Sequence, residues 1–190
     1  LVTSNSVLRE TSSAAFDFAC FYAMDAAFDG NNLNRLNDDM LWKRNAAKAV
    51  TFVANHDTDI IYNSKLSAYA YIMTHEGYPT VFYRDYEEWL DKAKMDNLFW
   101  VHRNLAVGNT SILYVDTDEY IARRNGSPGL VVYFNNSTVW QERWIQTNWT
   151  STGIHDYTGA SGWWPTTQGD KWVKIQAPPK GYTVWSPNGL

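Results

Sequence analysis

The first half of the chain alternates short apolar runs with segments of helical periodicity. Strands are predicted at residues 14–18, 49–54 and 80–83, and helices at 21–28, 33–40, 65–75 and 92–106. The run at 49–54 is almost unbroken in its apolar character, which is typical of a parallel strand buried on both faces. Strands and helices in strict alternation indicate parallel β/α units. Only three such units are predicted, whereas a closed β/α barrel needs eight in about 250 residues.

The second half of the chain has a different pattern, in which short strand-like runs are separated by turn-forming residues. Strands are predicted at 111–115, 120–124, 129–135, 143–146, 153–157, 172–176 and 182–185. Such spacing, with Gly, Asn, Asp, Ser and Pro between the runs, predicts an antiparallel sandwich or Greek key. The composition changes near residue 108, so we expect an α/β domain at 1–107 and an all-β domain at 108–190.

A cluster of polar residues directly follows the strand at 49–54. Asn55, His56, Asp57 and Asp59 lie within five residues, and it is not expected that all four are buried together in a core. In open and closed α/β sheets, chemistry is placed at the carboxyl ends of the strands. The cluster therefore predicts a site for hydroxyl-rich or cationic ligands, with an anionic group available for electrostatic catalysis.

The composition of the chain argues against some kinds of binding partner. The net charge is −4 and no basic patch is visible, so nucleic acid is not an expected partner. No run is long and apolar enough to span a bilayer, so no membrane partner is expected either. Aromatic residues make up 16% of the chain, which fits either a well-filled core or stacking against sugars. The single cysteine, Cys20, lies in an apolar run and is predicted to be a small core residue.

Metal binding is not predicted for this chain. The four histidines and Cys20 lack the spacing of a ligand set, and no calcium-loop pattern is present.

The polar cluster and its strand also carry a resemblance to a known family. Phe52-Val53-Ala54-Asn55-His56-Asp57 resembles the motif at the end of the seventh barrel strand of α-amylases, in glycoside hydrolase family 13. Residues 77–83 are similar to the eighth-strand segment, and residues 181–186 to the last strand of the C-terminal β domain. Residues 51–61 and 82–90 look most like the archaeal-type enzymes. The resemblance extends from about residue 14 to residue 186.

The resemblance implies that the chain is the C-terminal portion of an α-amylase. It would hold the last three β/α units of a TIM (β/α)8 barrel, strands six to eight, followed by an antiparallel β-sandwich known as domain C. The implied activity is retaining, endo-acting hydrolysis of internal α-1,4-glucosidic bonds in starch and related glucans by a secreted, extracellular enzyme. The missing N-terminal half of the barrel would be a required partner, and calcium is expected for the whole enzyme but not in this chain.

The same resemblance assigns roles to two residues. Asp57 matches the family's third catalytic carboxylate, which stabilises the oxocarbenium-like transition state, and His56 matches a substrate-binding residue that contacts glucose hydroxyls. The nucleophile and the general acid, about 5–5.5 Å apart in retaining enzymes, sit on the fourth and fifth strands and are absent from this sequence. A glucanotransferase or exo-acting relative, and a non-catalytic glucan-binding fragment, remain as alternatives.

Other polar residues have a structural and a functional interpretation. Asp59 is expected to cap the next helix rather than reach substrate. Arg84 and Asp85 are expected to pair with each other on a solvated loop rather than line a cleft. Asp17 is expected to make a structural hydrogen bond.

The remaining candidates lie in helices or in the β domain. His75 and His102 are expected to be structural, and His155 lies in the β domain. Trp163 and Trp164 are either a sugar-stacking pair or a turn-packing pair. Adjacent strand residues face opposite sides, so at most one of the two is expected on a flat surface.

Overall fold

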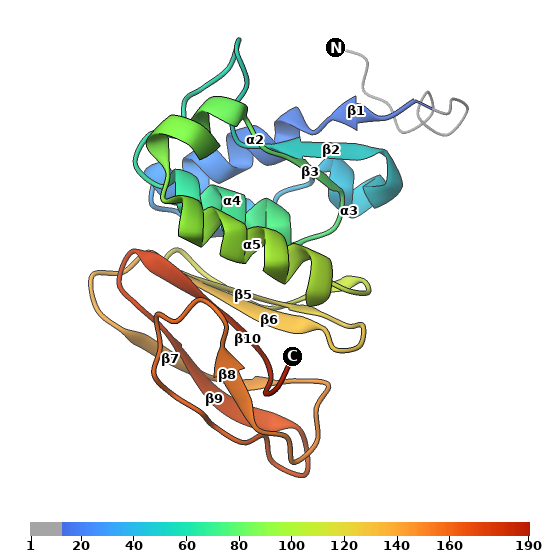
Figure 1. Ribbon diagram of the computed structural model, residues 1–190, viewed down its shortest axis with the longest axis vertical. Helices are drawn as coiled ribbons and strands as arrows, with labels where there is room; N and C mark the ends of the chain where they lie inside the picture. The colour runs from blue at the N-terminus through green and yellow to red at the C-terminus, as the bar shows by residue number, and fades with distance from the viewer. Residues whose placement is uncertain (1–12) are drawn as a thin grey trace.

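A computed structural model describes residues 13–190 and shows an α/β part joined to a β domain (Figure 1). The α/β part contains three short strands, β1 (Ala15–Phe16), β2 (Ala49–Phe52) and β3 (Tyr78–Thr80). They form a parallel sheet in the order β1-β2-β3, as predicted. The central strand β2 is largely buried.

Helical segments connect and cover these strands. Their bounds are α2 (Phe18–Met24), the π-helical turn η1 (Asp25–Asp29), the 3-10 turns η2 (Leu33–Asn37) and η3 (Ala46–Lys48), α3 (Leu41–Asn45), α4 (Lys65–Thr74), the π-helical turn η4 (Asp85–Trp89) and α5 (Lys92–Asn104). The predicted helices at 65–75 and 92–106 are confirmed as α4 and α5. The predicted helical segment at 33–40 is shorter in the structure, where it forms as the 3-10 turn η2.

Asp17 explains why the first strand is shorter than expected. Its Oδ1 accepts a hydrogen bond from the backbone N–H of Cys20 at 3.0 Å, and its Oδ2 accepts one from the N–H of Trp42 at 2.9 Å. A buried Asp in this position caps the following helix, so β1 ends at Phe16 and α2 begins at Phe18 instead of residue 21. The expected structural hydrogen bond of Asp17 is thereby confirmed.

The third strand is displaced toward the N-terminus relative to the prediction of 80–83. It begins directly after Gly77, whose φ is +114°, and it contains Pro79. Because a proline has no N–H to donate, it is confined in sheets to edge strands, bulges and the starts of strands. Within residues 13–190, β3 pairs with β2 alone, and Pro79 is the second of its three residues.

The β domain contains the seven strands predicted after residue 108. They are β4 (Thr110–Val115), β5 (Glu119–Arg124), β6 (Leu130–Asn135), β7 (Gln141–Gln146), β8 (Ile154–Asp156), β9 (Trp172–Ala177) and β10 (Gly181–Pro187). Five of them form a sheet in the order β4-β5-β6-β10-β8, and β7 pairs with β9 in a second sheet. All the pairings are antiparallel, so the predicted class of this half is confirmed.

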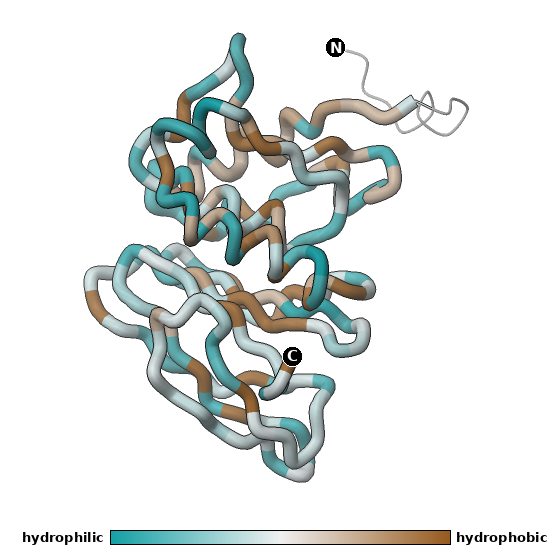
Figure 2. The backbone as a smooth tube through the Cα atoms, in the orientation of Figure 1, coloured by the Kyte–Doolittle hydropathy of each residue, from teal (hydrophilic) through white to brown (hydrophobic). Residues whose placement is uncertain are grey.

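The molecule is layered, with the five-stranded sheet in the middle (Figure 1). Alternate residues of its strands enter two different cores. Tyr120 and Phe134 pack with α-helical residues such as Tyr71, whereas Ile121 and Tyr133 pack with the β7–β9 sheet. The tube in Figure 2 shows apolar segments on both sides of this sheet. The α/β part and the β domain therefore share a continuous core, and the β7–β9 sheet is the layer farthest from the helices.

His75 lies at the junction of the two parts. Its Nδ1 is 2.8 Å from the carbonyl oxygen of Tyr71, and its Nε2 is 2.9 Å from the hydroxyl of Tyr120. The carbonyl can only accept, so Nδ1 carries the proton and Nε2 accepts from Tyr120 in the neutral ring. The side chain is fully enclosed, and this burial lowers the pKa of His75 to about 3. The expected structural role is confirmed.

The lowered pKa of His75 predicts acid sensitivity. Below an unfolded-state pKa of 6.5 the unfolded chain binds a proton that the folded chain excludes, so stability falls as the pH drops from about 6.5 toward about 3. The expected slope from this residue is about 1.4 kcal/mol per pH unit. In urea unfolding between about pH 6.5 and pH 4.5, the stability of His75→Gln should fall with decreasing pH less steeply than that of the parent, by about this amount. Equal slopes for the parent and His75→Gln would contradict the assignment.

Candidate functional site at the carboxyl end of β2

The loop after β2 is held by a compact turn built on Asn55. Its side-chain Oδ1 accepts hydrogen bonds from the backbone N–H groups of Asp57 and Thr58, both at 2.9 Å. The N–H of Asn55 donates to the carbonyl of Thr58 at 2.9 Å. An asparagine that binds the backbone two residues on fixes such a turn locally. Asn55 thus orients the turn and presents the two residues that follow it.

His56 and Asp57 are neighbours at the tip of this turn. The His56 Nε2 atom lies 3.2 Å from Asp57 Oδ2, and the two side chains are 84% and 80% exposed. In Figure 1 the loop after β2 rises at the top of the view, at the end of the α/β part away from the β domain. A carboxylate and an imidazole presented together can accept and donate hydrogen bonds to ligand hydroxyls. Strong electrostatic action would need further walls that exclude water.

A buried ionic cluster lies beside this loop. The Nζ of Lys65, a side chain only 3% exposed, is 2.9 Å from Asp59 Oδ2 and 2.6 Å from Asp85 Oδ1. The hydroxyl of Tyr69 donates to Asp85 Oδ2 at 2.7 Å. The cluster connects the loop after β2, the first turn of α4 and the turn after β3. It therefore fixes the base of the loop that carries Asp57.

The cluster corrects two expectations. Asp59 does not cap α4, because its carboxylate pairs with Lys65. The backbone just before α4 is held instead by Asp29, which accepts from the N–H groups of residues 62, 63 and 64 at 2.8–3.1 Å. Asp85 does not pair with Arg84, which instead contacts Glu88 in solvent. The physical reason is the same in both cases. A lysine ammonium that is buried has to be neutralised by nearby carboxylates.

Burial also determines the protonation of two neighbouring groups. Burial and the hydrogen bond to Asp85 raise the pKa of Tyr69, so its hydroxyl stays a proton donor at neutral pH. Burial raises the pKa of the Cys20 thiol, and the side chain is completely enclosed in the core, as predicted.

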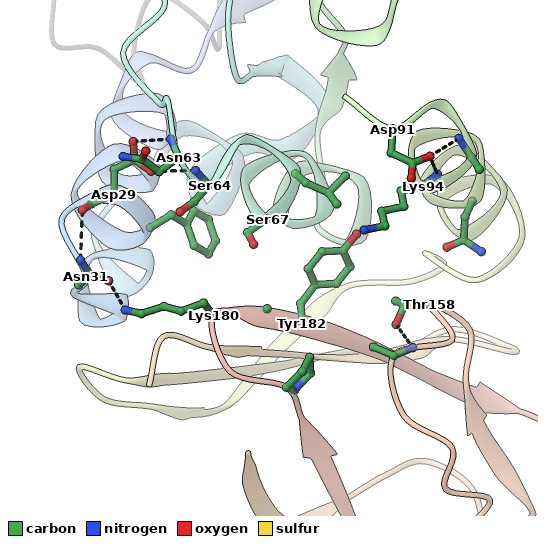
Figure 3. Close-up of a pocket in the computed structure, with 17 residues that line it drawn as sticks. Asp29, Asn31, Asn63, Ser64, Ser67, Asp91, Lys94, Thr158, Lys180 and Tyr182 are labelled. Atoms are coloured by element: carbon green, nitrogen blue, oxygen red, sulfur yellow. Dashed lines mark hydrogen bonds between the residues drawn. The ribbon is translucent and has the colours of Figure 1, made fainter. Parts of the chain in front are cut away.

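A cleft of about 970 Å³ lies elsewhere, between the helices and the β domain (Figure 3). Asp29 and Asp91, the carboxylates that the described residues bring to it, are both occupied by backbone N–H groups: Asp29 by those just before α4 and Asp91 by those of the first turn of α5. Lys180 reaches across to Asn31 Oδ1 at 2.5 Å. The cleft offers hydrogen-bonding groups but no free acid–base pair. Asp57 is not among its lining residues, so the cleft is separate from the loop after β2.

Sequence reasoning missed this cleft because its walls come from segments that are far apart. They are supplied by residues 28–31, 63–67, 91–97, 158–160 and 178–182. Locally, Asp29 only ends a helical segment before Gly30, and Asp91 stands just before α5, where an Asp is an ordinary N-cap.

The remaining candidate residues serve packing or lie on the surface. His102 Nδ1 is 2.9 Å from the carbonyl of Met73, which confirms a structural role. Trp163 packs against the inner core of the β domain. Trp164 is 66% exposed and stacks on His155, with ring centroids 4.4 Å apart. As expected, only one of the two adjacent tryptophans lies on the surface.

Two further properties concern residues 13–190. No group of three or more His, Cys, Asp or Glu side chains in this range is arranged to hold a metal ion. No helix in it has the length and apolar character needed to cross a membrane.

The known sequences similar to this chain that are described below are α-amylases. Residues 130–186 match a family model described as "Alpha-amylase C-terminal". An alpha-amylase type B isozyme of Hordeum vulgare is 37% identical over 90 residues, covering 42% of this chain and 59% of the relative. An alpha-amylase of Geobacillus stearothermophilus is 29% identical over 191 residues, covering 88% of this chain and 34% of the relative. The chain thus spans less than two thirds of either protein.

Comparison with solved structures gives the same fold. CldA, described as a cyclomaltodextrin glucanotransferase with three domains, superposes with a TM-score of 0.72 at 22% identity, over 90% of this chain and 44% of that one. An Anoxybacillus α-amylase superposes with a TM-score of 0.65 at 19% identity, over 90% and 47% of the two chains. Residues 130–186 therefore resemble the C-terminal domain of α-amylases, and the likeness to the solved structures shows a shared fold.

Proposed function

We propose that this chain forms part of a retaining, endo-acting α-amylase that hydrolyses internal α-1,4-glucosidic bonds of starch and related glucans. The observation that carries the proposal is the Asp57 carboxylate, exposed with His56 at the carboxyl end of a parallel strand. That is where α/β enzymes place their chemistry. The similarity to proteins named alpha-amylase supports the substrate class. The archaeal-type subgroup and a secreted, extracellular location belong to the same proposal.

In this proposal Asp57 stabilises the transition state and His56 binds glucose hydroxyls. Cleavage develops positive charge at the anomeric carbon, and a fixed carboxylate beside it lowers the barrier by an amount comparable to an oxyanion donor, about 3–4 kcal/mol. The nucleophile and the general acid, about 5–5.5 Å apart, would come from strands that this sequence does not contain. Calcium would be bound elsewhere in the complete enzyme.

The unpaired edges of the parallel sheet support a larger assembly. Within residues 13–190, β1 and β3 each pair only with β2. Phe16 ends β1 and Phe18 begins α2, and both side chains are about half exposed, although each ring meets Phe52 at a centroid distance of about 5 Å. Unpaired strand edges with exposed apolar side chains favour association with further strands. We propose that the rest of a TIM barrel pairs with both edges and covers these rings.

Product analysis of the complete protein on soluble starch tests the proposed reaction. An endo-acting hydrolase should lower iodine staining early, raise the number of reducing ends, and release products first as the α-anomer. The fold similarity to a cyclomaltodextrin glucanotransferase favours a transferase as the second candidate. Cyclic or lengthened products without a net gain of reducing ends would favour that candidate and exclude the hydrolase.

Residues 1–190 alone are expected to have no starch-cleaving activity. The reason is that the proposed mechanism needs a nucleophile and a proton donor that the isolated chain lacks. A reducing-sugar assay with the purified chain, run beside the complete protein at equal molarity, measures this. Cleavage by the isolated chain above the no-enzyme blank would contradict the proposed division of roles.

A further inference from the structure

The outer face of the β7–β9 sheet carries a regular set of side chains that the proposed catalysis does not use. Trp144 lies opposite Lys174, and Gln146 lies opposite Trp172. Side chains alternate between the two faces of a strand, and the inward set enters the core. These inward residues are Ile145, Val173, Ile175 and Ala177. The outward positions within the strands are therefore Glu142, Trp144, Gln146, Trp172, Lys174 and Gln176, which we call the outer tryptophan face.

Its two tryptophans are unusually exposed for their type. Trp144 is 52% and Trp172 is 39% exposed, although tryptophan is among the most buried side chains on average. They are diagonal neighbours across the two strands, so their positions are separated by about 7–8 Å. Trp140, just before β7, is exposed as well. The core beneath is already filled by the inward residues, so packing of this domain does not account for the exposed indoles.

The groups around the indoles indicate the kind of ligand. Lys174 forms an ion pair with Glu142 across the strands, so the charges on the face neutralise each other. The amide of Gln176 donates to Ser161 Oγ at 2.7 Å, and that of Gln146 donates to the carbonyl of Asp170 at 3.3 Å. Their carbonyl oxygens remain acceptors. None of the six outward strand positions holds an aliphatic side chain.

This arrangement fits a sugar better than a protein or a charged polymer. The centre of a protein interface is a continuous apolar patch depleted in charge, whereas here charged and amide groups lie between the aromatic rings. A nucleic acid or another anion would need a net positive face, and Lys174 is neutralised. A glucose unit has one apolar C–H face for an indole and a rim of hydroxyls for amides and ionic groups.

We propose that the outer tryptophan face binds a chain of α-1,4-linked glucose by stacking on Trp144 and Trp172. The choice of α-glucan rests on the proposed function. The face is on the layer farthest from the helices, whereas the Asp57 loop lies at the opposite end of the α/β part (Figure 1). A polymer held there leaves the Asp57 loop free. The face would keep the enzyme on polymeric or granular starch without taking part in bond cleavage.

Affinity electrophoresis of residues 1–190 tests the proposal directly. The protein is run in native gels containing soluble starch, dextran or hydroxyethyl cellulose, beside Trp144→Ala/Trp172→Ala and the control Trp164→Ala. Trp164 is also exposed, but it is not part of the β7–β9 sheet, and one face of its ring is covered by His155. Starch should retard the parent and the control. The double variant should bind starch at least about tenfold more weakly, which corresponds to about 1.4 kcal/mol. Unchanged circular dichroism would show that the double variant is folded.

Several results would overturn the inference. The inference fails if starch does not retard the parent, or if it retards the double variant as strongly as the parent. It also fails if Trp164→Ala loses as much starch binding as the double variant, or if dextran or hydroxyethyl cellulose retards the parent as strongly as starch does. In the complete enzyme, the double variant should cleave short maltooligosaccharides at the parent rate and starch granules several-fold more slowly. Failure of the proposed catalysis would appear separately, as absence of maltooligosaccharide cleavage by the parent enzyme.

Discussion

Replacing Asp57 with Asn in the complete enzyme is expected to lower kcat on soluble starch by about 10²–10³-fold. The substitution keeps the size and the hydrogen-bonding reach of the side chain but removes its charge. A preorganised group that meets charge developing in the transition state contributes an effect of this size when it is removed. Steady-state kinetics on soluble starch, with KM determined separately from kcat, measures the change.

Stability should hardly change in the same variant. The Asp57 side chain is 80% exposed, and the turn is held through its backbone N–H and Asn55. Exposed substitutions of this kind usually stay within about 0.5 kcal/mol. Asp118→Asn, an exposed aspartate in the β domain, is the matched control and should keep the parent kcat. A near-parent kcat for Asp57→Asn would remove Asp57 from the mechanism.

Much of this fold could be predicted from local sequence patterns. The apolar run at 49–54 became the buried strand β2, because a central parallel strand needs apolar residues on both faces. Turn-forming residues and the alternation of apolar and polar positions located the seven strands of the β domain, because both signals can be seen within a short stretch of sequence. The motif ending in Asp57 likewise lies on one strand and its following turn, so its position at a strand end could be predicted.

Long-range pairing could not be predicted in this way. Lys65 and Asp85 are 20 residues apart, and their contact exists only once α4 packs beside the turn after β3. Asp29 binds the N–H of Ser64, the residue before α4, from 35 residues away, and no local pattern indicates that contact. The alternation of Trp172, Lys174 and Gln176 with buried residues is visible in the sequence. Its pairing with β7, which creates the outer tryptophan face, depends on the topology of the sandwich.

Lys65→Met is expected to destabilise the chain by about 3–5 kcal/mol. The ammonium is almost fully buried and contacts both Asp59 and Asp85. Its removal leaves the Asp85 carboxylate buried without its ionic partner, and breaking a buried pair from one side has a cost of this order. Urea unfolding at about pH 7 measures the change. Arg84→Met is the control, because the Arg84–Glu88 pair is solvent-exposed and should contribute less than about 1 kcal/mol.

A double variant separates the ionic contribution from simple loss of packing. Asp85→Asn in the Lys65→Met background removes the unpaired charge and retains an acceptor for the Tyr69 hydroxyl. The pair Lys65→Met/Asp85→Asn should therefore be more stable than Lys65→Met alone, with a coupling energy within the range of about 0.5–3 kcal/mol found for contacting residues. Charge pairing would not hold the base of the Asp57 loop if Lys65→Met lowered the free energy of unfolding no more than Arg84→Met does, or if adding Asp85→Asn lowered it further. If Asp85→Asn instead restores part of the stability lost in Lys65→Met, the base of that loop is stabilised by the buried ammonium of Lys65 and its two carboxylate partners.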